Sequence, residues 1–193
     1  MSDVHIIAGL GNPGETYERT RHNVGFMTVD RLSDRHGGGF RKGKGSYVET
    51  RISVGGAPVI LVKPLTFMNL SGQAVQQVVQ FYKVTDLDRL LVVVDDFHLP
   101  FGTLRLRPGG SAAGQKGLQS VMQSLATPTV PRLRIGIGTP RGNPANYVLT
   151  PFGKAEQADL PLILDHAADA VERTVSHGLT DAMNLYNKHL LDD

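Results

Sequence analysis

Residues 90–94 form an uninterrupted run of leucine and valine that ends in two aspartates, Asp95 and Asp96. A strand that is apolar on both faces is typical of the centre of an α/β sheet, because helices cover both of its faces. Strand-like and helix-like patterns alternate around this run, and two strands flank Gly55 and Gly56 as a hairpin. The sequence therefore predicts an α/β fold, a single domain with a mixed β-sheet flanked by helices.

Hydrophobic periodicity predicts where the elements lie. Strands are expected at residues 4–8, 47–54, 58–62, 90–94, 103–107 and 132–137. Helices are expected from residue 24 to the glycines at 37–39, and at residues 70–83, 118–125, 160–175 and 179–190. Residues 40–45 are basic and interrupted by glycine, which predicts a mobile loop.

Composition limits the chemistry. The chain has 193 residues, the size of one domain, and contains no cysteine. Thiolate nucleophiles, disulfides, iron–sulfur clusters and thiolate zinc sites are thereby excluded. No apolar run approaches the roughly 20 residues of a membrane span, and the start of the sequence lacks a signal-peptide pattern. We expect a soluble cytoplasmic protein whose formal net charge of +2 does not by itself demand a polyanionic partner.

The first strand runs into a glycine-rich turn, Gly9-Leu10-Gly11-Asn12-Pro13-Gly14, which fits the pattern G-x-G-x-x-G. Two features oppose a dinucleotide site. Pro13 lacks an N–H group for a pyrophosphate, and no acidic residue ends a second strand about 20 positions later. The turn is therefore either a tight turn that needs glycine or a turn that presents Asn12 to a ligand.

His22, Asp95 and Asp96 are the candidate groups for proton transfer. Histidine is the side chain best suited to exchange a proton near neutral pH. The aspartates follow a central strand, where ligands gather in α/β sheets, and a carboxylate there can orient a histidine or, in a pair, hold a metal. A partly buried helix-terminal histidine and capping aspartates are the structural alternatives. No further His, Asp and Glu set has metal-ligand spacing, so no metal site is predicted.

The glycine-rich segment at residues 109–117 precedes a helix and is compatible with anion contact through backbone N–H groups and Lys116. It is not a P-loop, because Gln115 occupies the lysine position, and it is not a nucleophile elbow. Two strands also place arginines on their polar faces, where they form either a basic surface or ordinary solvated faces. These arginines are Arg105, Arg107, Arg132 and Arg134.

Several segments together resemble the bacterial peptidyl-tRNA hydrolase family. They follow the family's order and span almost the whole chain, and their combination is highly specific. The segments are Gly9-Leu10-Gly11-Asn12-Pro13-Gly14, Tyr17 with Thr20-Arg21-His22-Asn23-Val24-Gly25, Lys63-Pro64-Leu65-Thr66-Phe67-Met68-Asn69-Leu70-Ser71-Gly72, Asp95-Asp96 with Leu99-Pro100-Phe101-Gly102, and Arg132-Leu133-Arg134-Ile135-Gly136-Ile137-Gly138.

The resemblance implies hydrolysis of the ester between a peptide and the tRNA 3′ end, which recycles tRNA from abandoned translation. It also implies a twisted mixed sheet, no cofactor and no metal, and we expect a monomer whose partner is peptidyl-tRNA. By this resemblance His22 is the general base and Asp95 orients it. Asn12 helps to distinguish a blocked peptidyl amine from a free aminoacyl amine, and Asn69 positions the substrate and the attacking water.

The resemblance further implies that Tyr17 and Phe67 line the path of the tRNA 3′ end, where an aromatic face can stack on a base. Lys116 is expected to bind substrate. Phosphate contacts are expected from three arginines of the polar strand faces, which are Arg105, Arg107 and Arg134.

Two positions depart from the family pattern. The family usually has His-Asn-Gly where this chain has Gln115-Lys116-Gly117, and a histidine where Val94 precedes Asp95. These departures leave a second hypothesis, a non-enzymatic RNA-binding protein on the same scaffold, as in organelle relatives that act in splicing. The intact set of His22, Asp95 and the two asparagines favours the enzyme.

Overall fold

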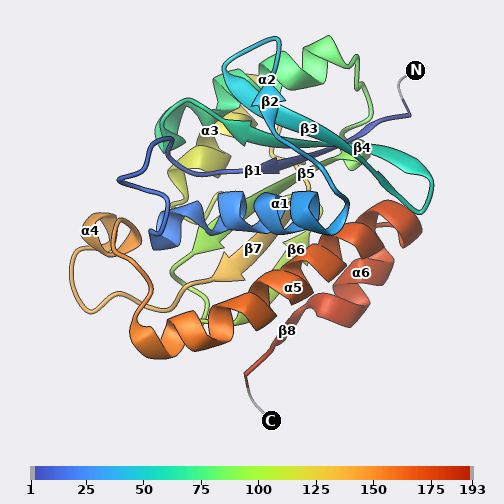
Figure 1. Cartoon of the computed structure of the whole chain (residues 1–193). Coiled ribbons are helices and arrows are strands. Elements are labelled where there is room, and N and C mark those ends of the chain that lie inside the picture. Colours follow the sequence, from blue (N-terminus) through green and yellow to red (C-terminus); the bar gives the residue numbers. More distant parts are fainter. Residues whose placement is uncertain (1–2, 192–193) are drawn as a thin grey trace.

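The structure is a computed structural model that describes residues 3–191. Within these residues, helices surround one mixed β-sheet, which confirms the α/β class (Figure 1). The strands are β1 (His5–Gly9), β2 (Arg41–Lys42), β3 (Tyr47–Val54), β4 (Ala57–Pro64), β5 (Leu90–Asp96), β6 (Thr103–Arg107), β7 (Arg132–Gly136) and β8 (Lys188–His189). The helices are α1 (Val24–Arg35), α2 (Ser71–Phe81), α3 (Lys116–Leu125), α4 (Pro144–Val148), α5 (Lys154–His177) and α6 (Leu179–Tyr186), with 3-10 turns η1 (Arg21–Asn23), η2 (Met68–Leu70) and η3 (Leu87–Arg89).

The strand order is β2-β3-β4-β1-β5-β7-β6-β8 among the described residues. The four inner strands β4, β1, β5 and β7 run parallel, and the outer pairs are antiparallel. Every residue of β5 is buried, as its apolar sequence predicts. The two aspartates therefore end a central strand, at the edge where parallel strands present their carboxyl ends.

Two apolar cores lie on opposite faces of the sheet. One contains side chains from α1, α5 and α6, and the other contains side chains from α2 and α3. Alternate residues of β5 supply both cores, Leu91 and Val93 to the first and Val92 and Val94 to the second. Figure 1 shows α2 and α3 across the sheet from α1, α5 and α6. This layered arrangement leaves the carboxyl edge of the central strands for a site.

Glycines bring the first helix very close to this edge. A Cβ added to Gly9, at the end of β1, would lie 2.2 Å from the carbonyl oxygen of Gly25 in α1. A Cβ added to Gly25 would lie 2.5 Å from the carbonyl oxygen of Val93 in β5. Only glycine permits this approach, which places η1 directly beside the end of β5. Helix–strand packing therefore requires glycine at Gly9, a reason that differs from the predicted tight turn.

Several local predictions are wrong. Residues 41–42 of the expected mobile loop form β2, which pairs with β3, and the final helix ends at Tyr186, after which β8 pairs with β6. The short helix α4 was not predicted. Two-residue strands and a five-residue helix carry too little periodicity to be found from sequence.

Arg132 also differs from the prediction of a polar strand face. Its side chain is fully buried, and its guanidinium donates to the backbone carbonyl oxygens of Val130, Gly110 and Pro128 at 2.6–3.1 Å. Burial, and secondarily the charge of Arg134, lowers the pKa of Arg132 to about 10. This arginine supports the loops around β7 and does not belong to a solvent-facing basic surface.

Candidate active site

His22 and Asp95 form a buried pair at the carboxyl edge of the sheet. His22 lies in η1 and Asp95 near the end of β5, and the imidazole Nδ1 is 2.8 and 2.9 Å from the two carboxylate oxygens. The Asp95 side chain is 2% exposed and that of His22 is 13% exposed. A carboxylate that accepts from Nδ1–H selects the tautomer in which Nε2 is free to accept a proton. The pair therefore has the arrangement of a general base with its orienting acid.

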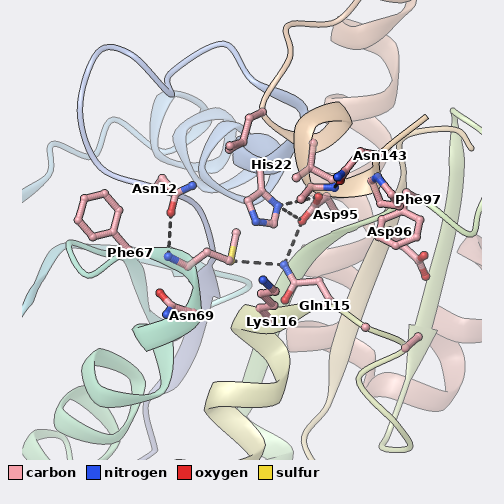
Figure 2. Close-up of a pocket in the computed structure, with 17 residues that line it drawn as sticks. Asn12, His22, Phe67, Asn69, Asp95, Asp96, Phe97, Gln115, Lys116 and Asn143 are labelled. Carbon is pink, nitrogen blue, oxygen red and sulfur yellow. Dashed lines mark hydrogen bonds and ion pairs between the residues drawn. The ribbon is translucent and has the colours of Figure 1, made fainter. Parts of the chain in front are cut away.

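A third side chain completes this group. The Gln115 amide Nε2 donates to Asp95 Oδ1 at 3.0 Å, so that the carboxylate is held from both sides (Figure 2). Gln115 is the residue before α3, and the glycine-rich segment that precedes it brings it to the end of β5. The sequence identified Gln115 only as a departure from a family pattern and did not indicate this contact.

Asn12 is fixed at the base of the same site. Its side-chain oxygen accepts from the Met68 N–H at 2.7 Å, and it is 7% exposed. The Asn23 side chain bonds both the N–H and the carbonyl of Asn12, at 2.8 and 2.9 Å. Asn23 and Met68 therefore hold the turn and the Asn12 side chain in place. Their roles were not predicted from sequence.

A cavity of about 510 Å³ brings together most of the predicted site residues. Its walls come from the turn after β1, from η1, η2, the end of β5, the start of α3 and the region of α4. The predicted residues that line it are Asn12, His22, Phe67, Asn69, Asp95 and Lys116. Asp96 and Gln115 line it as well. The cavity is open to solvent. Two of its lining residues, Phe67 and Asn69, are exposed and are called its rim.

Tyr17 lies beside the cavity. It is not among the residues that line it, but its ring packs edge-on against Phe67 with ring centroids 6.4 Å apart. Phe67 is 56% exposed, more than any other large apolar residue in the described part of the chain. The two rings form an aromatic rim at the cavity mouth.

The predicted phosphate-binding arginines lie outside the cavity lining. Arg105 and Arg107 are exposed on β6, and the sheet register places Arg105 opposite Arg134. Arg134 is 3.5 Å from Asp96 and also donates to the carbonyl of Ser111. The arginines are thus clustered on one face of β6 and β7, with Arg134 partly neutralised by Asp96.

Arg21 connects η1 to the opposite wall of the cavity. Its guanidinium donates to the Pro151 carbonyl at 2.6 Å and to the Glu156 carboxylate at 2.7 Å, and it stacks 4.3 Å from the centre of the Tyr147 ring. The segment held in this way carries α4, whose residues line the cavity beside His22. These contacts of Arg21 could not be predicted from the sequence, because its partners lie about 130 residues away.

The described part of the chain has neither a metal-binding cluster nor a membrane-spanning helix. Within residues 3–191, no three His, Asp or Glu side chains lie close enough together to hold a metal ion. None of the helices in the described part of the chain is long and apolar enough to cross a membrane.

The sequence is similar to that of known peptidyl-tRNA hydrolases over nearly its full length. The peptidyl-tRNA hydrolase family model matches residues 6–192. The peptidyl-tRNA hydrolase of Chloroflexus aggregans is 52% identical over 184 residues, which covers 94% of this chain and 98% of that protein. The enzyme of Listeria welshimeri is 46% identical over 183 residues, with 94% and 99% coverage.

Solved structures extend the likeness to the fold. The crystal structure of peptidyl-tRNA hydrolase from Acinetobacter baumannii superposes with a TM-score of 0.90 at 35% sequence identity, and covers 98% of this chain and 97% of that one. The sequence match and the structural match both extend over nearly the full length. The chain therefore belongs to the peptidyl-tRNA hydrolase family.

Proposed function

We propose that this protein hydrolyses the ester bond between the peptide and the tRNA 3′ end of peptidyl-tRNA, with His22 as the general base. The observation that carries the mechanism is the contact of His22 Nδ1 with Asp95 inside a cavity large enough for an acyl ester. Membership of the peptidyl-tRNA hydrolase family supports the substrate and the reaction. The released tRNA returns to translation.

The reaction requires one proton to move twice. His22 Nε2 accepts a proton from a water molecule as the water oxygen attacks the ester carbonyl, which forms a tetrahedral oxyanion. Asp95 stabilises the imidazolium that results. The intermediate then expels the 3′ oxygen of the tRNA, which takes the proton back from His22. The products are the peptide carboxylic acid and the free tRNA hydroxyl, without a covalent enzyme intermediate.

Two asparagines are proposed to select and place the substrate. Asn12 is held rigidly by Asn23 and Met68, and its side chain lines the cavity close to His22. Because the side-chain oxygen already accepts from Met68, the Nδ2 group is the one available to substrate. It can donate to the carbonyl oxygen of the acyl group on a blocked amine, which a free, charged amine lacks. Asn69, exposed on the rim, is proposed to hold the substrate and the attacking water.

The tRNA is proposed to bind across the aromatic rim and the basic residues. The exposed Phe67 ring, supported by Tyr17, offers a face for a base of the 3′ end. Lys116 is the first residue of α3, where the helix dipole disfavours a cation, so an anionic partner would relieve that cost. Farther out, Arg105, Arg107 and Arg134 are proposed as contacts to acceptor-stem phosphates.

A turnover assay tests this function. Purified protein is mixed with N-acetyl-aminoacyl-tRNA and, separately, with the same aminoacyl-tRNA carrying a free amine, and the released tRNA is measured. The proposal predicts rapid release from the N-blocked substrate alone. Tight binding of tRNA without release of the acyl group would instead favour the RNA-binding alternative, for which the His22–Asp95 pair has no evident use. Equal release from both substrates would refute the assigned selectivity of Asn12.

A further inference from the structure

The buried amide of Gln115 lies between the catalytic carboxylate and the start of α3. Its Nε2 donates to Asp95 Oδ1 at 3.0 Å, and its Oε1 accepts from the Leu118 N–H at 2.6 Å. Nε2 also lies 3.4 Å from the sulfur of Met68. The residue is 9% exposed. Every polar atom of this side chain is therefore engaged.

The orientation of this amide is determined by its partners. The Leu118 N–H is one of the unpaired donors at the start of a helix and can bond only to the amide oxygen. The amide nitrogen is therefore directed at Asp95, to which it can only donate. Gly117 leaves room for this arrangement, because a Cβ there would lie 2.4 Å from the Met68 sulfur and 3.1 Å from Gln115 Oε1.

We propose that Gln115 is a positioning residue that locks Asp95 in the orientation required by His22, using a donor that does not titrate. The inference rests on the proposed function, since it assigns a role within the His22–Asp95 pair. Asp95 receives hydrogen bonds from two sides, the imidazole and the amide. With only one of these, the carboxylate can rotate about its χ2 torsion, and the imidazole loses its fixed direction. Figure 2 shows the continuous path from Gln115 through Asp95 to His22.

Gln115 also has a purely structural role. The test must distinguish the loss of that role from the loss of the contact with Asp95. Its oxygen caps α3, and loss of a helix cap lowers stability whether or not Asp95 is affected. A serine at this position can still cap the helix but is too short to reach Asp95. A glutamate has the shape of glutamine and can also cap, but it presents an oxygen to Asp95 in place of an N–H group.

The first variant is therefore Gln115→Ser, with Gln119→Ser as the matched control on the exposed face of the same helix. Hydrolysis of N-acetyl-aminoacyl-tRNA is measured together with the melting temperature of each protein. We expect kcat to fall about 10- to 100-fold in Gln115→Ser, the size of effect that misorientation produces, with KM and the melting temperature close to those of Gln119→Ser. Wild-type kcat in a folded Gln115→Ser protein would overturn the proposal.

The second variant, Gln115→Glu, uses pH as its readout. The titratable groups that line the cavity around Asp95 are His22 from η1, Asp96 from β5 and Lys116 from α3, and all three are unchanged in this variant. Two carboxyl groups at hydrogen-bond distance share one proton, and repel each other when it is lost. We expect the ratio of variant to wild-type kcat to be low and to be lowest at pH 8.5, after subtraction of spontaneous ester hydrolysis.

The outcomes separate this proposal from the proposed function. A Gln115→Glu enzyme that equals the wild type at pH 8.5 would show that Asp95 does not depend on the amide donor, and the positioning role would be refuted. If His22→Ala is inactive in the same assay, the general base stands and only the role of Gln115 is lost. If His22→Ala is fully active, the failure lies in the proposed function itself.

Discussion

Asp95 and Glu49 are both buried carboxylates of the sheet, and they have different surroundings. Asp95, at the carboxyl end of β5, is bonded by His22 and Gln115 and lines the cavity. Glu49, in the middle of β3, accepts one hydrogen bond from the Tyr82 hydroxyl at 2.9 Å and does not line that cavity. Its second oxygen has no hydrogen-bond partner among the described residues.

We propose that Asp95 serves the chemistry and that Glu49 serves the structure. Burial is similar, with Asp95 2% and Glu49 6% exposed, and so is not the criterion. The difference lies in what the partner can do next. The partner of Asp95 is an imidazole that faces a cavity and can exchange a proton, whereas the partner of Glu49 is a half-buried phenol that cannot do so near neutral pH. Disrupting the first should cost activity, and disrupting the second should cost stability.

The largest effect is expected for Asp95→Asn. The amide can no longer hold the imidazole in the tautomer that leaves Nε2 free, so the general base is lost. We expect kcat to fall about 10²–10⁴-fold, the usual contribution of a general base. Steady-state hydrolysis of N-acetyl-aminoacyl-tRNA measures this loss, and Glu49→Gln, expected to retain wild-type kcat, is the control. An Asp95→Asn enzyme with normal turnover would show that Asp95, like Glu49, is not needed for hydrolysis.

The complementary change is Tyr82→Phe. It removes the hydrogen-bond donor to Glu49 and leaves a buried carboxylate without a partner, which costs about 1–3 kcal/mol of the free energy of unfolding. Urea denaturation at pH 7 measures this loss, and kcat is expected to stay at the wild-type value. Loss of activity without loss of stability would contradict the assignment of Glu49 to a structural role.

The same tyrosine gives stability a pH dependence. Burial, then the hydrogen bond to Glu49 and its charge, raises the pKa of Tyr82 to about 12, against 10.0 for an ordinary tyrosine. Between these pH values the unfolded chain releases the Tyr82 proton and the folded chain keeps it, so stability is complete below pH 10 and falls toward pH 12. The loss is on the order of 2 kcal/mol.

Because Tyr47 and Tyr186 also have raised pKa values, the slope of stability against pH is compared between the wild type and Tyr82→Phe. The variant should show a shallower slope over this range. Identical slopes in the two proteins would mean that the Tyr82–Glu49 contact does not hold the phenol proton.

The smallest effect is expected at the rim of the catalytic cavity, for Lys116→Asn. If Lys116 contacts a tRNA phosphate, removal of one cation reduces the slope of log affinity against log salt by about 0.7–0.9. Binding of tRNA is measured between low and moderate salt, with Lys154→Asn, an exposed lysine outside the cavity lining, as the control. An unchanged slope in Lys116→Asn would assign the lysine a role other than phosphate binding.

Much of the fold follows from local patterns, and most of the candidate site follows from the resemblance of its motifs to the family. The apolar run of β5 predicts a central strand, and the motifs around Asn12, His22 and Asp95 predict the residues that the cavity brings together. Contacts between segments far apart in the chain could not be predicted. Gln115 contacts Asp95, which lies 20 residues earlier in the chain, and no periodicity or motif predicts that contact.

The burial of Arg132 is a second feature that could not be predicted from the sequence. Alternation along its strand correctly predicts that its side chain shares a face with Arg105, Arg107 and Arg134, but alternation does not tell whether loops cover that face. The carbonyl groups of the loops before and after α3 surround its guanidinium, so it is buried. Burial of a charged group depends on tertiary partners that a single sequence does not reveal.

The central claim is that His22, held by Asp95, removes the proton from the attacking water. It is tested most directly by the single-turnover rate of N-acetyl-aminoacyl-tRNA hydrolysis by His22→Ala, with saturating enzyme so that binding does not limit the rate. We expect a rate about 10²–10⁴-fold below the wild type, with tRNA affinity and melting temperature little changed. A rate within a few-fold of the wild type would contradict it.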